Sequence, residues 1–136
     1  MGQNQSFRKI NFEDMQIAIT RNYIIISTLN DSNQKCLIKN TIPHTEEVSV
    51  INSLLKTDRD ANIIIYGENS IDCSPNNKYK QLLDLGFANI HVYGGGLFEW
   101  LLLQDIYGIE EFPTNIRELD VLKYKGHGYF NMGLIK

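Results

Sequence analysis

Short apolar runs alternate along this chain with segments of helical periodicity, and this alternation narrows the folds that the chain can adopt. The runs at residues 23–27, 62–66 and 90–93 consist mainly of isoleucine, valine and tyrosine. Such short continuous runs are typical of strands that are buried on both faces of a sheet. Because helices must cover both faces of such a sheet, the sequence predicts an α/β protein with a parallel sheet between helices.

Helix signals fill most of the segments between these runs. Thr45 precedes two glutamates and is expected to cap a helix, because its hydroxyl can accept a hydrogen bond from the first turn. Gly86 and Gly108 are expected to end two further helices. Residues 36–42 are expected to form a short strand that stops before Pro43. The apolar face of the helix after Thr45 is expected to consist of Val48, Ile51, Leu54 and Leu55. The other expected helices cover residues 12–19, 76–85 and 97–106.

Composition and charge exclude several classes of protein. The chain has 136 residues, which suits one domain, and its net charge of -3 lacks the basic excess of a general nucleic-acid binder. No apolar run approaches the roughly 18 residues of a membrane-spanning helix. Cys36 and Cys73 are too few for a disulfide framework or a four-ligand zinc site. They indicate a reducing compartment, and we expect a cytoplasmic protein.

The first six residues match the M-G-x-x-x-[ST] pattern of N-myristoylation, with Gly2 as the acceptor. Arg8 and Lys9 follow and would meet anionic lipid headgroups. One myristoyl chain gives only reversible binding, with an association constant of about 10⁴ M⁻¹. The pattern predicts a peripheral membrane protein of a eukaryotic cell or virus. The alternative is a polar leader with no modification.

The middle of the chain carries a distinctive order of motifs. A strand that ends in Tyr66 is followed by a loop, a helix and the sequence Leu-Gly-Phe-Ala-Asn-Ile at residues 85–90. A second strand, a run of glycines and Trp100 complete the order. This stretch resembles the rhodanese-like domain family. The resemblance implies a three-layer α/β fold, with a central parallel sheet of about five strands and helices on both faces.

The resemblance also implies an active loop directly after Tyr66. Active members of the family carry a nucleophilic cysteine at the start of this loop and an arginine near its end. Here Gly67 occupies the first position, and the loop contains no arginine or lysine. Glu68 and Asp72 add negative charge that disfavours a thiolate and an anionic substrate. The loop equivalent consists of Gly67, Glu68, Asn69, Ser70, Ile71, Asp72, Cys73 and Ser74.

Cys73 is the candidate for a catalytic thiol. Ser74 is expected to cap the next helix, and Pro75 suits its first turn, so Cys73 would lie at a helix N-terminus. The helix dipole favours a thiolate there by about 0.3–1 kcal/mol at an exposed end, and the charge of Asp72 opposes it. The alternative is an incidental loop thiol. Cys36, beside two apolar residues, is expected in the core.

No metal or cofactor is expected from the remaining motifs. His44, His91 and His127 are far apart in the sequence and lack cysteine or acidic partners at ligand spacing. The glycines at 94–96 do not form a dinucleotide fingerprint, because the position of its third glycine holds Glu99. We expect these glycines to form a tight connection between a strand and a helix.

The chain divides into a leader at residues 1–9, a rhodanese-like domain at 10–113 and a C-terminal extension at 114–136. The extension is too apolar for a solvated end, so we expect it to pack on the domain, a protein partner or a second copy. The expected function is that of a catalytically degenerate interaction or regulatory module. The alternative is an atypical sulfurtransferase or persulfide carrier that uses Cys73. A related phosphatase comes third, because its loop also needs a cysteine and an arginine.

Overall fold

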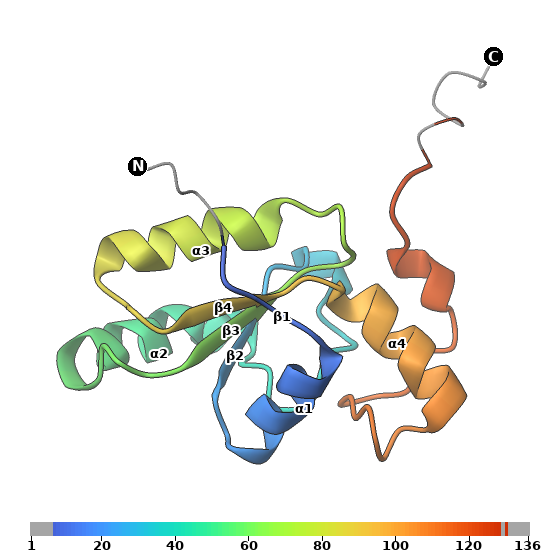
Figure 1. Cartoon of the computed structure of the whole chain (residues 1–136), viewed down its shortest axis with the longest axis horizontal. Helices are drawn as coiled ribbons and strands as arrows, with labels where there is room; N and C mark the ends of the chain where they lie inside the picture. Colours follow the sequence, from blue (N-terminus) through green and yellow to red (C-terminus); the bar gives the residue numbers. More distant parts are fainter. Residues whose placement is uncertain (1–6, 129, 131–136) are drawn as a thin grey trace.

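The computed structural model describes residues 7–128 and residue 130, and it has a parallel sheet at its centre (Figure 1). Within this part of the chain the sheet has four strands in the order β1-β4-β3-β2, all parallel. This is one strand fewer than the expected number. The strands are β1 (Lys9–Ile10), β2 (Ile24–Ser27), β3 (Ile63–Tyr66) and β4 (Ile90–Tyr93).

Helices cover both faces of the sheet, as expected. One core cluster joins one face of the sheet to α1 and α4, and a second cluster joins the opposite face to α2 and α3. Figure 1 shows α2 and α3 on one side of the strands and α1 and α4 on the other. The three-layer α/β architecture is therefore confirmed. The helices are α1 (Phe12–Thr20), α2 (His44–Thr57), α3 (Ser74–Leu85) and α4 (Gly96–Tyr107).

The three apolar runs of the sequence are continuous because each of β2, β3 and β4 contributes to both clusters. In β3, Ile64 and Tyr66 belong to the cluster with α1 and α4, whereas Ile63 and Ile65 belong to the cluster with α2 and α3. All four side chains of this strand are buried. Strands β2 and β4 flank β3 in parallel register, so the expected positions of these three strands are correct to within one residue.

The expected strand at residues 36–42 is wrong. Cys36 to Ile38 are buried, but the segment forms only isolated bridges, from Thr41 to Ile25 and from Ile38 to Thr114. Asn40 has a φ of 71°, which turns the chain away from an extended path. The buried Tyr66 hydroxyl holds the segment instead, because it accepts a hydrogen bond from the Ile38 N–H at 3.1 Å.

The predicted helix starts also need correction. Helix α2 begins at His44 and has Pro43 at its cap position, without a side-chain cap, so Thr45 lies inside the first turn. Val48, expected on the buried face, is 70% exposed, and Ile51 is the buried residue of this helix. Helix α3 begins at Ser74, one residue earlier than a Ser74 cap would allow. The local sequence therefore fixes these two helix starts only to within one or two residues.

Two predicted helix ends are correct. Gly86 follows α3 with a φ of 109°, and Gly108 follows α4 with a φ of 102°. Both values lie in the region that favours glycine.

Part of the C-terminal segment returns to the domain. The Trp100 indole donates a hydrogen bond to the carbonyl of Pro113 at 3.1 Å, and a short 3₁₀ helix, η2 (Val121–Tyr124), then packs against α4. Tyr124 is buried in the cluster of α1 and α4, and burial raises the pKa of its hydroxyl to about 12. The described residues contain no helix that is long and apolar enough to cross a membrane.

His91 on β4 makes stability depend on pH. It is half-buried, and its Nδ1 atom is buried without a hydrogen-bond partner among the described residues. Burial, followed by the charge of Arg8, lowers the pKa of His91 from 6.5. The unfolded chain therefore binds this proton more readily, and the fold loses stability as pH falls below about 6.5.

We expect the free energy of unfolding to decrease between about pH 7 and about pH 5, and to decrease less in His91→Gln. Urea unfolding at several pH values measures this. His127→Gln, at an exposed position, is the control and keeps the wild-type slope. Equal slopes in His91→Gln and wild type would show that His91 does not titrate in this way.

Candidate functional site

The loop between β3 and α3 lies at the carboxyl edge of the sheet, where parallel α/β sheets carry their sites. It runs from residue 67 to residue 73, between the ends of β2 and β4. The structure therefore brings the sequence-predicted loop residues together at this edge. The side chains that occupy the space inside this loop determine which ligands it can bind.

Gly67 lies beneath the carboxylate of Asp72. A Cβ atom at position 67 would collide with Oδ2 of Asp72 and would lie 2.8 Å from Cγ of Pro75. Gly67 is also buried. The place of a side chain at the first position of the loop is thus taken by a carboxylate from the end of the same loop.

The Asp72 carboxylate is held by donors of the loop and of α3. Its Oδ2 accepts a hydrogen bond from the Glu68 N–H at 3.0 Å. Its Oδ1 accepts from the Ser74 N–H at 2.9 Å and from the Ser74 hydroxyl at 2.8 Å. Ser74 therefore donates to Asp72, and the cap position of α3 is occupied by Cys73 and not, as expected, by Ser74. Donors of this kind bind anions at helix N-termini, and here they bind an anion that belongs to the chain.

Glu68 and Asn69 connect the loop to distant segments. The Asn33 amide, in a short 3₁₀ helix η1 (Asp31–Asn33), donates to Oε2 of Glu68 at 3.0 Å. The Asn69 amide donates to the carbonyl of Tyr124 at 2.9 Å, and its Oδ1 accepts from the Ile71 N–H. The loop is therefore fixed from both sides by segments outside the central motif.

The start of α4 also holds the loop. The N–H groups of Leu97 and Phe98 donate to the carbonyls of Gly67 and Glu68 at 2.9 and 2.8 Å. This approach depends on Gly96, which has a φ of 70° and whose Cβ would lie 2.7 Å from the Asn69 nitrogen. The glycines at 94–96 thus form the expected tight connection and also allow α4 to contact the loop.

Cys73 lies at the surface, directly before α3. Its Sγ atom is 3.9 Å from the carbonyl oxygen of Ile71. In the described part of the chain, no lysine, arginine or histidine forms a hydrogen bond with this sulfur. The loop thus places Cys73 outside the carboxylate-filled cradle. Cys36 is fully buried, as expected, and burial raises the pKa of its thiol.

A hydrogen bond that sequence reasoning missed lies beside the loop. The buried Tyr93 hydroxyl, at the end of β4, donates a short hydrogen bond to Oε1 of Glu99 on α4. Burial, followed by this bond, raises the pKa of Tyr93 well above its usual value. The Glu99 carboxylate lies over Gly95, so this carboxylate already has its contacts within the chain. No sequence motif predicts a hydrogen bond between Tyr93 and Glu99.

Small pockets open on both sides of the loop. One, of about 300 Å³, lies between β2, α2 and α3 and is lined by residues that include Thr28, Ser74 and Lys78. The Lys78 ammonium is paired there with Glu47. The other, of about 240 Å³, lies between the loop and the segment 125–127. Neither pocket is lined by a cysteine.

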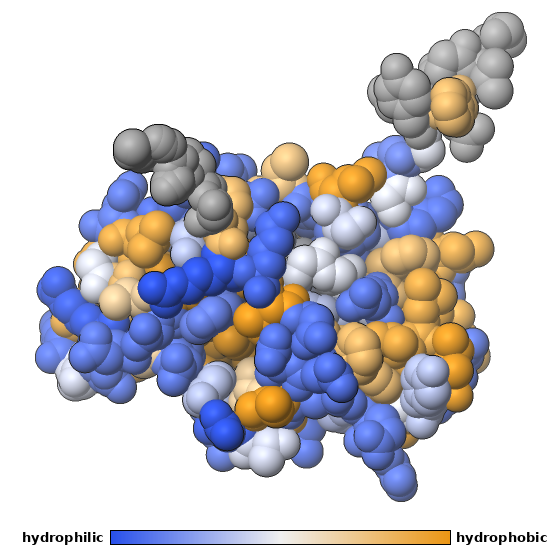
Figure 2. All heavy atoms as spheres, viewed as in Figure 1, coloured by the Kyte–Doolittle hydropathy of each residue, from blue (hydrophilic) through white to orange (hydrophobic). Residues whose placement is uncertain are grey.

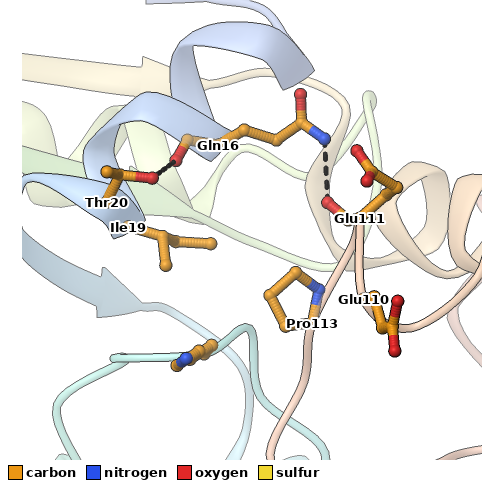
Figure 3. Close-up of a pocket in the computed structure, with 7 residues that line it drawn as sticks. Gln16, Ile19, Thr20, Glu110, Glu111 and Pro113 are labelled. Atoms are coloured by element: carbon orange, nitrogen blue, oxygen red, sulfur yellow. Dashed lines mark hydrogen bonds between the residues drawn. The ribbon is translucent and has the colours of Figure 1, made fainter.

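A larger hollow of about 380 Å³ lies away from the loop, between α1 and residues 110–113 (Figure 3). In this hollow the Gln16 amide donates to the carbonyl of Glu111 at 2.8 Å.

The described residues contain no group of three histidine, cysteine or acidic side chains that could hold a metal. His44 is 3.5 Å from the exposed carboxylate of Asp31.

Comparisons with known proteins agree with this architecture. The rhodanese-like domain family model matches residues 23–103, which is more than half of the chain. The chain therefore belongs to the rhodanese-like domain family. No curated protein matches the chain.

Solved structures of low sequence identity share the fold. The rhodanese-like domain of the Alr3790 protein from Anabaena is 18% identical, with a TM-score of 0.57 and coverage of 90% of this chain and 87% of that chain. The BH2092 protein from Bacillus halodurans is 15% identical, with a TM-score of 0.55 and coverage of 94% and 90%. Ygr203w, described as a yeast protein tyrosine phosphatase of the rhodanese family, is 14% identical, with a TM-score of 0.55 and coverage of 86% and 97%.

The contact between α4 and the loop predicts a contrast between two neighbouring glycines. We expect Gly96→Ala to lower the free energy of unfolding by about 1–3 kcal/mol or more, because of its φ and its approach to the backbone of the loop. Gly94→Ala is the control, since its Cβ would meet nothing within 4 Å. Chemical denaturation measures both variants. Equal stability of the two would show that the loop moves freely away from α4.

Proposed function

We propose that this chain is a catalytically degenerate rhodanese-like protein that acts as an interaction or regulatory module. One observation carries the proposal: the Asp72 carboxylate covers Gly67 and accepts the hydrogen bonds of Glu68 and Ser74. A sulfur nucleophile at position 67 would need the space that the Asp72 carboxylate fills. An anionic substrate that supplies sulfur would need the N–H and O–H groups that Asp72 already binds.

Electrostatics support the same conclusion. Sulfur transfer from an anionic donor needs positive groups that stabilise the incoming charge. The loop contains two carboxylates and no cation. Displacing Asp72 from the cradle would leave its negative charge beside the incoming anion, at a cost in free energy. The geometry thus fits a domain that keeps the rhodanese-like scaffold without its chemistry.

Cys73 is the alternative sulfur carrier, and its surface position at the start of α3 favours that alternative. The carboxylate of Asp72, in the preceding residue, already binds the nearby donors of Ser74. A persulfide on Cys73 would therefore lack the cradle. A phosphatase function, as described for the yeast relative, is disfavoured because this loop lacks an arginine and a cysteine at its first position.

A thiosulfate assay tests the proposal. We expect no cyanide-dependent thiocyanate formation, and no mass increase of about 32 Da, one sulfur atom, after incubation with thiosulfate. An active rhodanese is the positive control in the same assay. Turnover that disappears in Cys73→Ala, and persists in Cys36→Ala, would overturn the proposal in favour of the sulfur-carrier alternative.

We also propose that the protein is cytoplasmic and that myristoylation of Gly2 lets it bind membranes reversibly. Gly2 lies outside the described residues, and the support is the sequence pattern at residues 1–6 followed by Arg8 and Lys9.

Coexpression with an N-myristoyltransferase tests the lipid modification. We expect the intact mass to increase by one myristoyl group in the wild type and to stay unchanged in Gly2→Ala. The acylated protein is expected to sediment with vesicles that contain anionic lipid. An unmodified wild-type chain would disprove the tether and leave the proposal for the loop untouched.

A further inference from the structure

The described chain begins against the middle of helix α3. The ring of Phe7 packs edge-on against the ring of Tyr79, with 5.1 Å between the two centroids. The Lys80 ammonium lies 5.8 Å from the centroid of the Phe7 ring. Figure 1 shows the first described residues beside α3. The leader is therefore attached to the domain next to this helix.

Strand β1 turns a second lysine toward the same side. Ile10 packs against the cluster of α1 and α4, whereas Phe7 packs against the cluster of α2 and α3. Because successive side chains of a strand point to opposite faces, Lys9 faces the side of α2 and α3. Lys9 and Lys80 are both exposed, and both lie on the same side of the sheet as Phe7.

The free charges on this surface are mainly positive. Lys78 contributes no free charge, because its ammonium pairs with Glu47 on α2. Asp84, one turn after Lys80, is exposed and is the acidic residue of α3. Within the described part of the chain, no salt bridge joins Lys9 or Lys80 to a carboxylate. The surface thus carries two free ammonium groups and one carboxylate.

The segments at the edges of this surface do not reverse the balance. Residues 56–60 lead from α2 toward β3, and Arg59 lies against Gly86 at the end of α3. This segment contains one lysine, one arginine and two aspartates, so its charges cancel. The Arg8 guanidinium, which donates to the Ala88 carbonyl at 3.2 Å, adds a positive charge at the edge of the sheet.

Apolar side chains accompany the lysines. Leu83, one turn after Tyr79, is 45% exposed, and Phe7 is partly buried. Figure 2 shows hydrophobic surface over α3 next to hydrophilic surface. We call the surface formed by Phe7, Lys9, Lys80 and Leu83 the β1–α3 face. Lysines beside aromatic and aliphatic side chains are typical of surfaces at a membrane interface, where the lysine side chains reach the headgroups.

The leader restricts which surface an acyl chain can bring to a membrane. Phe7 is five residues along the chain from Gly2, so at about 3.6 Å per residue the two are at most about 18 Å apart. Figure 2 also shows hydrophobic surface over α4, at the right of the view. Helix α4 and the acidic first turn of α1 lie on the opposite side of the sheet from α3. The leader therefore favours the β1–α3 face.

We propose that the β1–α3 face lies against an anionic membrane surface when Gly2 is acylated. Lys9 and Lys80 then meet the lipid headgroups, and Phe7 and Leu83 contact the interface. A single myristoyl chain binds only marginally, and stable anchoring takes a second signal such as basic residues. The face supplies that signal from the folded domain. This inference rests on the proposed acylation of Gly2 and deepens it by naming the part of the domain that contacts lipid.

Sedimentation of the acylated full chain with vesicles of phosphatidylcholine and phosphatidylserine tests the face. We expect Lys80→Glu to weaken binding at least about fivefold, because one lysine is lost and one repulsive charge is added at the surface. Lys39→Glu is the matched control, since Lys39 is exposed and lines the hollow beside α1, on the opposite side of the sheet. This control makes the same change in net charge and is expected to keep the wild-type affinity.

Asp84→Asn tests the same face with the opposite sign. Removing the carboxylate one turn from Lys80 is expected to tighten binding to the anionic vesicles. On vesicles of phosphatidylcholine alone, the acylated wild type and all three variants are expected to bind alike, because the lysines act there on no anionic headgroup. Thermal unfolding checks that the variants remain folded.

The outcomes separate this inference from the acylation on which it rests. Acylated protein that binds anionic vesicles equally well with Lys80→Glu, or is weakened equally by Lys39→Glu, would overturn the β1–α3 face and leave the tether intact. A wild-type chain whose intact mass shows no acyl group would overturn both.

Discussion

The carboxylate of Asp72 organises the carboxyl edge of this sheet. It lies against Gly67 and joins the first turn of the loop to the first turn of α3. Hydrogen bonds to a charged group contribute about 1.5–3 kcal/mol each, so this acceptor stabilises the loop substantially. The donors that would otherwise meet a solvent anion are satisfied inside the protein. The contacts that stabilise the loop thus also occupy these donors.

The remainder of the structure supports this arrangement from outside the loop. Helix α4 donates two backbone N–H groups to loop carbonyls, and Asn69 reaches the carbonyl of Tyr124. Tyr124 is itself buried in the core, so the C-terminal segment and the loop are parts of one packed unit. Loops are usually the least stable parts of a domain because they make few such contacts. Here the loop is bonded to three other segments of the chain.

The sequence predicted the strands more accurately than the site. Burial on both faces gives β3 an unbroken apolar pattern and β4 a pattern interrupted by the half-buried His91, and both strands lie where these patterns placed them. Residues 36–38 share that pattern because they are buried, yet the φ of Asn40 ends the extended path. Burial therefore does not imply pairing in a sheet. Helix starts were wrong by one or two residues because Pro43 and Ser74 allow more than one start.

The candidate site shows a different limit. The family pattern identified Gly67 as the position of the absent nucleophile, and the acidic residues of the loop indicated repulsion of anions. Nothing in the spacing showed that Asp72 folds back over Gly67, because that contact depends on the conformation of the whole loop. The partners of Asn69 and Tyr93 likewise depend on tertiary packing. The sequence thus predicts which groups of the family pattern this loop lacks, and the structure shows that the Asp72 carboxylate lies over Gly67.

Helix α4 links the loop to the outer surface. Its first turn is bonded to the loop, and its inner face, with Leu97, Trp100 and Leu101, is fully packed in the core. The outer face is consequently presented on a rigid element. The same backbone hydrogen bonds that hold the loop therefore also fix the position of α4 on the sheet.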